Sequence, residues 1–230
     1  SEGRSAAGED MKGAGVMEHY VITIARGFGS GGKEIGSRLA ERLGIPCYES
    51  QILRMASEYS GINERLFNEA DERLKSRKKF LGYLKKVPFT SIAEPYMKAF
   101  TSDVNLFNIQ SQIIRQLVMS ESCVIIGKCA DYVLRSYPNV ISIYIEAPRE
   151  ACLKSIMNKM GVDADEAAKM IEKTDKYRAD YYNYYTQGGI WTNPVNYDMT
   201  LNSARVGREN CVDVIEQYIK LKFGRSSECI

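Results

Sequence analysis

The sequence predicts a three-layer α/β/α fold in which helices cover both faces of a parallel β-sheet. The first observation is that the runs at 20–24, 123–126 and 140–145 are apolar on most successive residues, as expected for strands buried on both faces. The second is that helical patterns separate these runs, and such an alternation is typical of a parallel sheet. A chain of 230 residues can bury one core of this kind, so we expect one domain with an insertion.

The first strand is followed by a glycine-rich turn and then by a helix. The turn, Ala25–Glu34, contains four glycines, which permit positive φ angles and remove the Cβ atoms that would keep an anion away. After it, Ile35, Leu39 and Leu43 recur every fourth residue, which predicts the apolar face of a helix. Backbone N–H groups and the positive end of that helix would then face one anion, so this segment is typical of a phosphate-binding loop.

The spacing Gly27-x4-Gly32-Lys33 satisfies every position of the Walker A phosphate-binding pattern except the last, which is normally Ser or Thr. Here that position is Glu34. A hydroxyl usually binds Mg²⁺ there, so two hypotheses are open for Glu34. Its carboxylate either binds the metal or caps or pairs within the protein, leaving the metal to other residues.

Two other interpretations of this turn are open. Gly27-x-Gly29-x-x-Gly32 also fits a dinucleotide-binding turn, and Glu49 falls close to the acid expected near the end of the second strand. The turn could also simply connect a strand to a helix. Lys33 would have no role in either case, so its position at the end of the loop favours phosphate binding.

The remaining elements are predicted from the same patterns, taken in chain order. Gly44-Ile45-Pro46 ends the first helix. The segment 50–118 contains no convincing strand, which predicts a helical insertion. The other expected elements are a short strand at 47–49, helices at 51–60, 63–79 and 104–119, a helical segment at 130–136, a helix between Pro148 and Gly161, a helical region at 163–185, a strand at 197–202 and a closing helix at 208–223.

Composition excludes a membrane-spanning protein and favours a soluble enzyme. The hydrophobic fraction of 44%, the charged fraction of 26% and the net charge of +2 are ordinary for globular proteins. No apolar run approaches the length of a membrane span, and residues 1–18 predict a tag remnant or disordered lead-in. The six cysteines contain no CxxC pair and lie mostly in apolar runs, so we expect reduced thiols and a cytoplasmic location.

Candidate ligand-binding residues follow the third predicted strand, because ligands of such sheets bind at the carboxyl ends of strands. Gly127 lets the chain turn close to a ligand, Lys128 offers a cation and Asp131 offers a carboxylate. A surface position is the alternative for Lys128. Its place directly after a buried strand and a glycine favours a contact with phosphate.

A second candidate cluster lies in the helical region 163–185. Lys173 and Lys176 form one i, i+3 pair, and Asp175 and Arg178 form another, so each pair shares a helix face. With the flexible joint Gly188-Gly189 behind it, this helix suits a lid that closes over phosphates, although a salt-bridged solvent face fits the spacing equally well. The tyrosines between 177 and 185 are expected to pack on the core, on a partner subunit or on a base.

Four segments together resemble the bacterial cytidylate kinase-like family, whose members are P-loop relatives of nucleoside monophosphate kinases. The resemblance runs from about residue 20 to about residue 220, and in it Lys128 stands where the family usually has Arg. The four segments are Gly29–Ile35 with Gly44–Pro46, Ile125–Leu134, Asp175–Tyr182 and Asn196–Ser203.

This resemblance implies a P-loop NTPase fold in a kinase domain of residues 19–225. Within it, 50–118 would be the helical insertion that binds the nucleoside monophosphate, and 163–189 the helical lid. The implied activity is transfer of the γ-phosphate of ATP, with Mg²⁺, to CMP or dCMP. A kinase for another small phosphate acceptor and a nucleotide-binding regulator without transfer activity are the alternatives. The expected partners are small-molecule nucleotides, with no nucleic acid or membrane, and a homodimer is left open.

The resemblance also implies roles for individual residues. Catalysis would fall to Lys33 and Arg178, with Lys176 or Lys173 neutralising the transferring group. The metal ligands are not assigned. ATP would be bound by Gly27, Gly29, Ser30, Gly31, Gly32, Lys33 and Glu34, and the acceptor by Glu49, Lys128, Asp131, Asp175 and Lys173.

Overall fold

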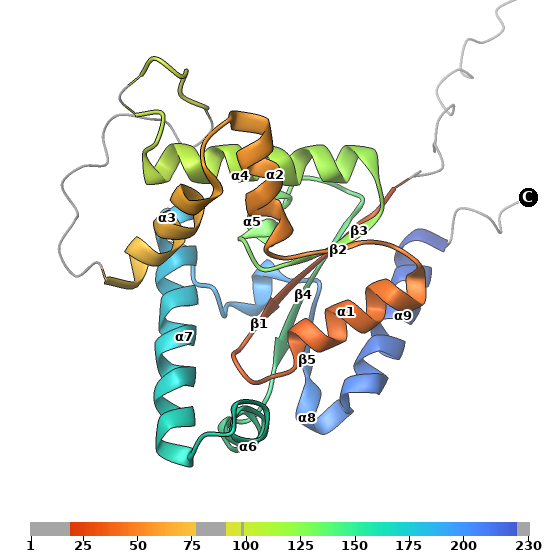
Figure 1. Ribbon diagram of the computed structural model, residues 1–230. Helices are drawn as coiled ribbons and strands as arrows, with labels where there is room; N and C mark the ends of the chain where they lie inside the picture. The colour runs from red at the N-terminus through yellow and green to blue at the C-terminus, as the bar shows by residue number, and fades with distance from the viewer. Residues whose placement is uncertain (1–18, 77–90, 98, 225–230) are drawn as a thin grey trace, which may run out of the picture.

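A five-stranded sheet lies at the centre of the protein (Figure 1). The structure is a computed structural model that describes residues 19–76, 91–97 and 99–224. The strand order is β2-β3-β1-β4-β5, and every neighbouring pair is parallel. This confirms the predicted parallel sheet. The strands are β1 (Val21–Arg26), β2 (Cys47–Tyr48), β3 (Cys123–Ile126), β4 (Val140–Glu146) and β5 (Met199–Asn202).

The central strand β1 is buried along almost its whole length, which explains its β-branched sequence. It pairs with β3 on one side, where Ile24 lies opposite Ile126, and with β4 on the other, where Arg26 lies opposite Ile145. The carboxyl ends of these three strands therefore meet at one edge of the sheet. The segments that follow them are brought together there, although they are far apart in the sequence.

Helices α1 (Gly32–Leu43) and α9 (Arg208–Phe223) cover one face of the sheet. Their apolar sides bury Leu39 and Ile215 against the strands. On the solvent side, Arg42 of α1 donates hydrogen bonds to Asp213 at 2.7 Å and to Glu216 at 2.8 Å. The two helices thus form one layer, as the predicted three-layer fold requires (Figure 1).

The opposite layer contains the helical insertion. The insertion comprises α2 (Gln51–Ser60), α3 (Glu64–Ser76) and α4 (Asp103–Ser120), and α5 (Ala130–Val133) packs in the same layer. No strand occurs among the described residues of 50–118, as predicted. The expected end of the second insertion helix at 77–79 lies outside the described residues, and so does the lead-in at 1–18.

The helical region expected as a lid is one continuous helix, α7 (Ala164–Tyr185). Its N-terminal half packs through Ile171 on α6 (Arg149–Met160), whereas its C-terminal half belongs to the main core. There the rings of Tyr185 and Phe107 stack with centroids 4.0 Å apart. The C-terminal half of α7 is therefore anchored. The lid movement expected for residues 163–189 stays a prediction.

Two short elements were not predicted, a 3-10 helix at Pro194–Asn196 and the single turn α8 (Ser203–Val206). Both lie beside β5, near the end of the chain, where the sequence lacks a longer helical period. None of the cysteines among the described residues forms a disulfide. Within residues 19–76, 91–97 and 99–224, no helix is long and apolar enough to cross a membrane.

Candidate active site

The loop Gly27–Lys33 runs from the end of β1 into the first turn of α1 and is held by two serine hydroxyl groups, one from the loop and one from α8. Ser30 Oγ donates a hydrogen bond to the carbonyl oxygen of Gly27 at 2.8 Å, and Ser203 Oγ of α8 donates to the carbonyl oxygen of Ser30 at 2.5 Å. Gly31 has a φ of 83°, and a Cβ there would lie 2.5 Å from Arg208 Nε. This position therefore requires glycine both for its backbone and for the space it leaves.

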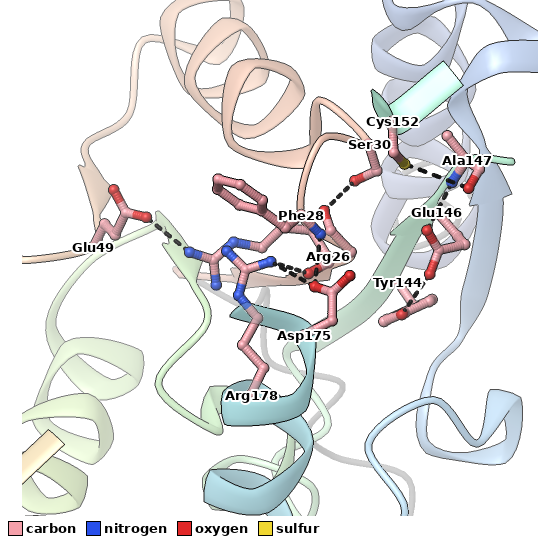
Figure 2. Close-up of polar contacts among 11 residues, drawn as sticks. Arg26, Phe28, Ser30, Glu49, Tyr144, Glu146, Ala147, Cys152, Asp175 and Arg178 are labelled. Atoms are coloured by element: carbon pink, nitrogen blue, oxygen red, sulfur yellow. Dashed lines mark hydrogen bonds and ion pairs between the residues drawn. The ribbon is translucent and has the colours of Figure 1, made fainter. Parts of the chain in front are cut away.

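Lys33 stands at the start of α1, where its ammonium group meets a carboxylate from the end of β2. Its Nζ lies 2.5 Å from Glu49 Oε2, and Arg26 Nη2 lies 2.8 Å from Glu49 Oε1. Figure 2 shows the Glu49–Arg26 contact. Burial opposes the ionisation of Glu49, but the hydrogen bond from Lys33 and the charges of Arg26, Lys33 and Lys128 hold its pKa below the ordinary value. Glu49 therefore carries a negative charge between these cations.

Helix α7 is tied to the loop by Arg178 and Asp175. Arg178 Nη1 donates to the carbonyl oxygen of Arg26 at 2.8 Å and lies 3.3 Å from Asp175 Oδ1 (Figure 2). The same carboxylate oxygen accepts the backbone N–H of Phe28 at 2.8 Å. Burial lowers the pKa of Arg178 and raises that of Asp175. The structure thus brings both residues to the phosphate-binding loop.

A cavity of about 610 Å³ lies beside the loop, between the ends of β1 and β3, helix α2 and helix α7. Of the expected site residues, those that line it are Glu49, Lys128, Asp131, Lys173 and Arg178. The loop residues Gly27–Lys33 lie outside its lining, and so do Glu34, Asp175 and Lys176. Arg26 also lines it, and aromatic rings form part of the wall. The aromatic residues are Tyr177, Tyr181, Tyr182 and Trp191.

Lys176, like Lys33, is an expected catalytic residue that does not line the cavity. Its ammonium group is largely exposed and lies 3.5 Å from Asp180 Oδ2, one turn further along α7. The cavity face of this helix instead follows the i, i+4 spacing of Lys173, Tyr177 and Tyr181. The sequence placed Lys173 and Lys176 on one face, but only Lys173 faces the cavity.

The turn after β3 has an unusual backbone. Lys128 and Cys129 have backbone φ angles of 61° and 53°, and residues other than glycine rarely adopt positive φ angles. Gly127 precedes them with a φ of 75°. A Cβ on Gly127 would collide with Arg26 Nη1, so the turn leaves room for that guanidinium group. The strain therefore lies at the wall of the cavity, where such strain is often functional.

Asp131 follows this turn in the first turn of α5 and is buried. Its Oδ2 accepts a hydrogen bond from Tyr182 Oη at 2.9 Å. Burial raises the pKa of Asp131 from 3.8 to about 6, against the hydrogen bonds from Tyr182 and from backbone N–H groups. The folded protein therefore keeps the Asp131 proton up to a higher pH than the unfolded chain does.

We expect Asp131→Asn to remove a pH dependence of stability. Between about pH 4 and pH 6 the unfolded chain loses the Asp131 proton while the folded protein keeps it, so wild-type stability falls as pH rises through this window. The difference between pKa values of 3.8 and about 6 corresponds to roughly 3 kcal/mol above pH 6. Asparagine stays neutral, so urea unfolding of the variant should lack this fall. The exposed Asp165→Asn serves as the control, and identical pH slopes for wild type and Asp131→Asn would contradict the prediction.

Glu34 forms ion pairs within the protein. Its two carboxylate oxygens lie 2.8 Å from Arg38 Nη2 and 2.5 Å from Arg208 Nη1, and Arg208 also donates to Ser155 Oγ at 2.9 Å. This is the arrangement expected if Glu34 pairs within the protein. Within the described chain, no group of three His, Cys, Asp or Glu side chains is placed to hold a metal ion.

Glu34→Gln should lower stability and leave the Mg²⁺ dependence of activity unchanged. Each of the two partly exposed ion pairs contributes about 0.2–1 kcal/mol, so we expect the melting temperature to fall by a few degrees. Thermal unfolding and initial rates over a Mg²⁺ titration measure the two effects on one variant. A shift of the Mg²⁺ curve to higher concentration would show instead that Glu34 is a metal ligand.

Three residues of the site were missed by the sequence analysis. Arg26 is the last residue of β1, and Ser203 directly follows β5, so the rule that ligands bind at carboxyl ends of strands could have identified both. Arg208 contacts the loop from the start of α9, 174 residues away from Glu34. No local signal in the sequence indicates that contact.

The chain is similar to one protein family and to several solved structures. A model of the cytidylate kinase-like family matches residues 21–205. The structure of an uncharacterized protein from Eubacterium ventriosum ATCC 27560 is similar with a TM-score of 0.63 and 27% identity, covering 88% of this chain and 99% of that one. The search of curated proteins found no match.

Two shikimate kinases are also among the similar structures. The enzyme from Bacteroides thetaiotaomicron has a TM-score of 0.47 and 13% identity, and the alignment covers 87% of this chain and 98% of that one. The enzyme from Acinetobacter baumannii, in complex with shikimate, has a TM-score of 0.44 and 12% identity, with 88% and 94% covered.

Proposed function

The chain belongs to the cytidylate kinase-like family, and from this premise we propose that it transfers the γ-phosphoryl group of ATP to CMP or dCMP. The observation that carries the proposal is the cavity beside the phosphate-binding loop, which combines cations with aromatic rings. Its volume of about 610 Å³ lies within the usual range for small-molecule sites. Such a wall suits an acceptor with a phosphate at one end and a planar base at the other. Its cations are Arg26, Lys128, Lys173 and Arg178.

The loop and Lys33 would hold the β- and γ-phosphates of the donor. The loop places its backbone at the start of α1, where N–H groups and the helix dipole favour an anion. The side chain of Lys33 is largely exposed, so its ammonium group can reach a phosphate oxygen. Mg²⁺ would bind with the nucleotide and neutralise part of the phosphate charge.

The transfer step needs no nucleophile from the protein. A phosphate oxygen of the acceptor is already ionised at neutral pH, so it can form the new P–O bond without losing a proton to a base. The bond to ADP breaks, and ADP leaves with the electron pair. Arg178 would stabilise the charge on the transferring group, since α7 holds its guanidinium against the loop. Lys128 and Lys173 would position the acceptor phosphate.

A substrate panel with ATP and Mg²⁺ tests this proposal. ADP release and product identity are measured for CMP, dCMP, UMP, AMP, GMP and a set of small non-nucleotide acceptors, with Lys33→Ala protein as the control for contaminating kinases. We expect CMP and dCMP to react fastest. Turnover only on a non-nucleotide acceptor would show a kinase of another specificity, and ATP binding without turnover would show a nucleotide-binding regulator.

A further inference from the structure

Arg26 is a buried cation to which the proposed reaction assigns no role. It is the last residue of β1, its side chain is 16% exposed, and it lines the cavity. Burial, together with the charge of Arg178, lowers its pKa to about 10. Its Nε is buried without a hydrogen-bond partner within the described part of the structure. An arginine in such a place requires a counter-charge, because a buried, unpaired cation is costly.

The counter-charge of Arg26 in the structure is Glu49, and the same carboxylate serves the loop lysine. One oxygen of Glu49 lies 2.8 Å from Arg26 and the other 2.5 Å from Lys33 Nζ. The charge of Lys128 also favours the ionised form of Glu49. A single carboxylate is thus surrounded by three cations at the junction of the loop and the cavity.

The cavity holds more positive than negative charge even with Glu49 in place. Among the described residues that line it, four carry a cationic side chain and two an acidic one. One of the two acids is Asp131, and burial raises its pKa to about 6. Gly127 leaves the space that the guanidinium of Arg26 occupies, so the turn after β3 is shaped around this group. These features describe an anion site built around Arg26.

We propose that Arg26 is a phosphate-binding residue and that Glu49 is its exchangeable counter-ion. Carboxylate and phosphate oxygens accept the same hydrogen bonds from guanidinium and ammonium groups, so one can replace the other. When phosphate groups enter, Glu49 leaves Lys33 and Arg26, and phosphate oxygens take its place. Glu49 thereby keeps the cations neutralised in the empty protein and competes with weakly bound anions. The identity of the anion as a nucleotide phosphate rests on the proposed function.

Binding of inorganic pyrophosphate, measured by titration calorimetry, tests the exchange. Glu49→Gln removes the competing charge, so it should bind pyrophosphate about tenfold more tightly than wild type, a difference of about 1.4 kcal/mol. Without ligand the variant should melt at a lower temperature, because Arg26 loses its counter-charge, and pyrophosphate should restore more stability than it does in wild type. Glu58→Gln, an exposed residue of α2 paired with Arg54, is the matched control. Unchanged or weaker binding by Glu49→Gln would overturn the exchange.

Arg26→Lys tests the role of the guanidinium and keeps the positive charge. In the Glu49→Gln background it should weaken pyrophosphate binding by about tenfold, because lysine lacks the forked donor geometry of arginine. An unchanged affinity in a variant that melts as a folded protein would overturn the role of Arg26. No acceptor is present in these titrations. If both variants change pyrophosphate affinity as expected but the protein does not turn over CMP, only the proposed function is refuted. If the protein turns over CMP but neither variant changes pyrophosphate affinity, only this exchange is refuted.

Discussion

Lys33→Ala should reduce kcat/KM for the proposed transfer by about 10²- to 10³-fold, which corresponds to a loss of roughly 2.7–4 kcal/mol of transition-state stabilisation. Lys33 ends the phosphate-binding loop, and its ammonium group is the loop cation that can follow the phosphate charge as it shifts toward the leaving ADP. The side chain of Lys33 is 63% exposed, so its removal should leave the fold intact. Initial rates with saturating and limiting ATP measure the loss.

The control for Lys33→Ala is Lys220→Ala, which removes an exposed lysine of α9 far along the chain from the loop. Both variants should unfold at nearly the wild-type temperature. ATP binding should weaken only in Lys33→Ala. Wild-type turnover by a folded Lys33→Ala protein would show that the loop does not bind the phosphates of the donor.

Arg178→Ala should lower kcat by about 10³-fold or more, as expected for an arginine that stabilises the transferring phosphoryl group. Its guanidinium lies at the junction of loop, cavity and α7, held by the carbonyl oxygen of Arg26 and by Asp175. Arg178→Lys keeps the charge but not the forked donor geometry, so we expect an intermediate loss of about 10- to 10²-fold. Single-turnover rates separate this loss from weaker substrate binding.

The control for Arg178 is Arg65→Ala, which removes an exposed arginine of α3 that pairs with Glu69. That variant should keep the wild-type kcat. The hydrogen bond between Arg178 and the loop also stabilises the fold, so circular dichroism is measured first. If folded Arg178→Ala keeps its kcat and only KM rises, Arg178 binds substrate and does not act in the transition state.

The fold class and most of the elements could be predicted from the amino-acid sequence alone. The strand 123–126 and the helix 208–223 were predicted with the bounds that the structure shows. Both depend on local patterns, an apolar run for a buried strand and a period of 3.6 for a helix. The phosphate-binding loop was also recognisable, because its glycines and Lys33 are adjacent in the chain. The CMP specificity implied by the resemblance stays a prediction.

Which charged side chains meet at the site could not be predicted from the sequence, because it depends on how the elements pack. Glu49 bridges Lys33 and Arg26 because the order of the strands places β2 next to β3, on the side of β1 where the cavity lies. Arg208 reaches Glu34 because α9 packs beside α1. The orientation of α7 on the core turns Lys173 toward the cavity and Lys176 toward solvent. Each of these contacts joins residues that are distant in the sequence. The packing of the sheet and helices determines which residues meet, and local periodicity does not encode that packing.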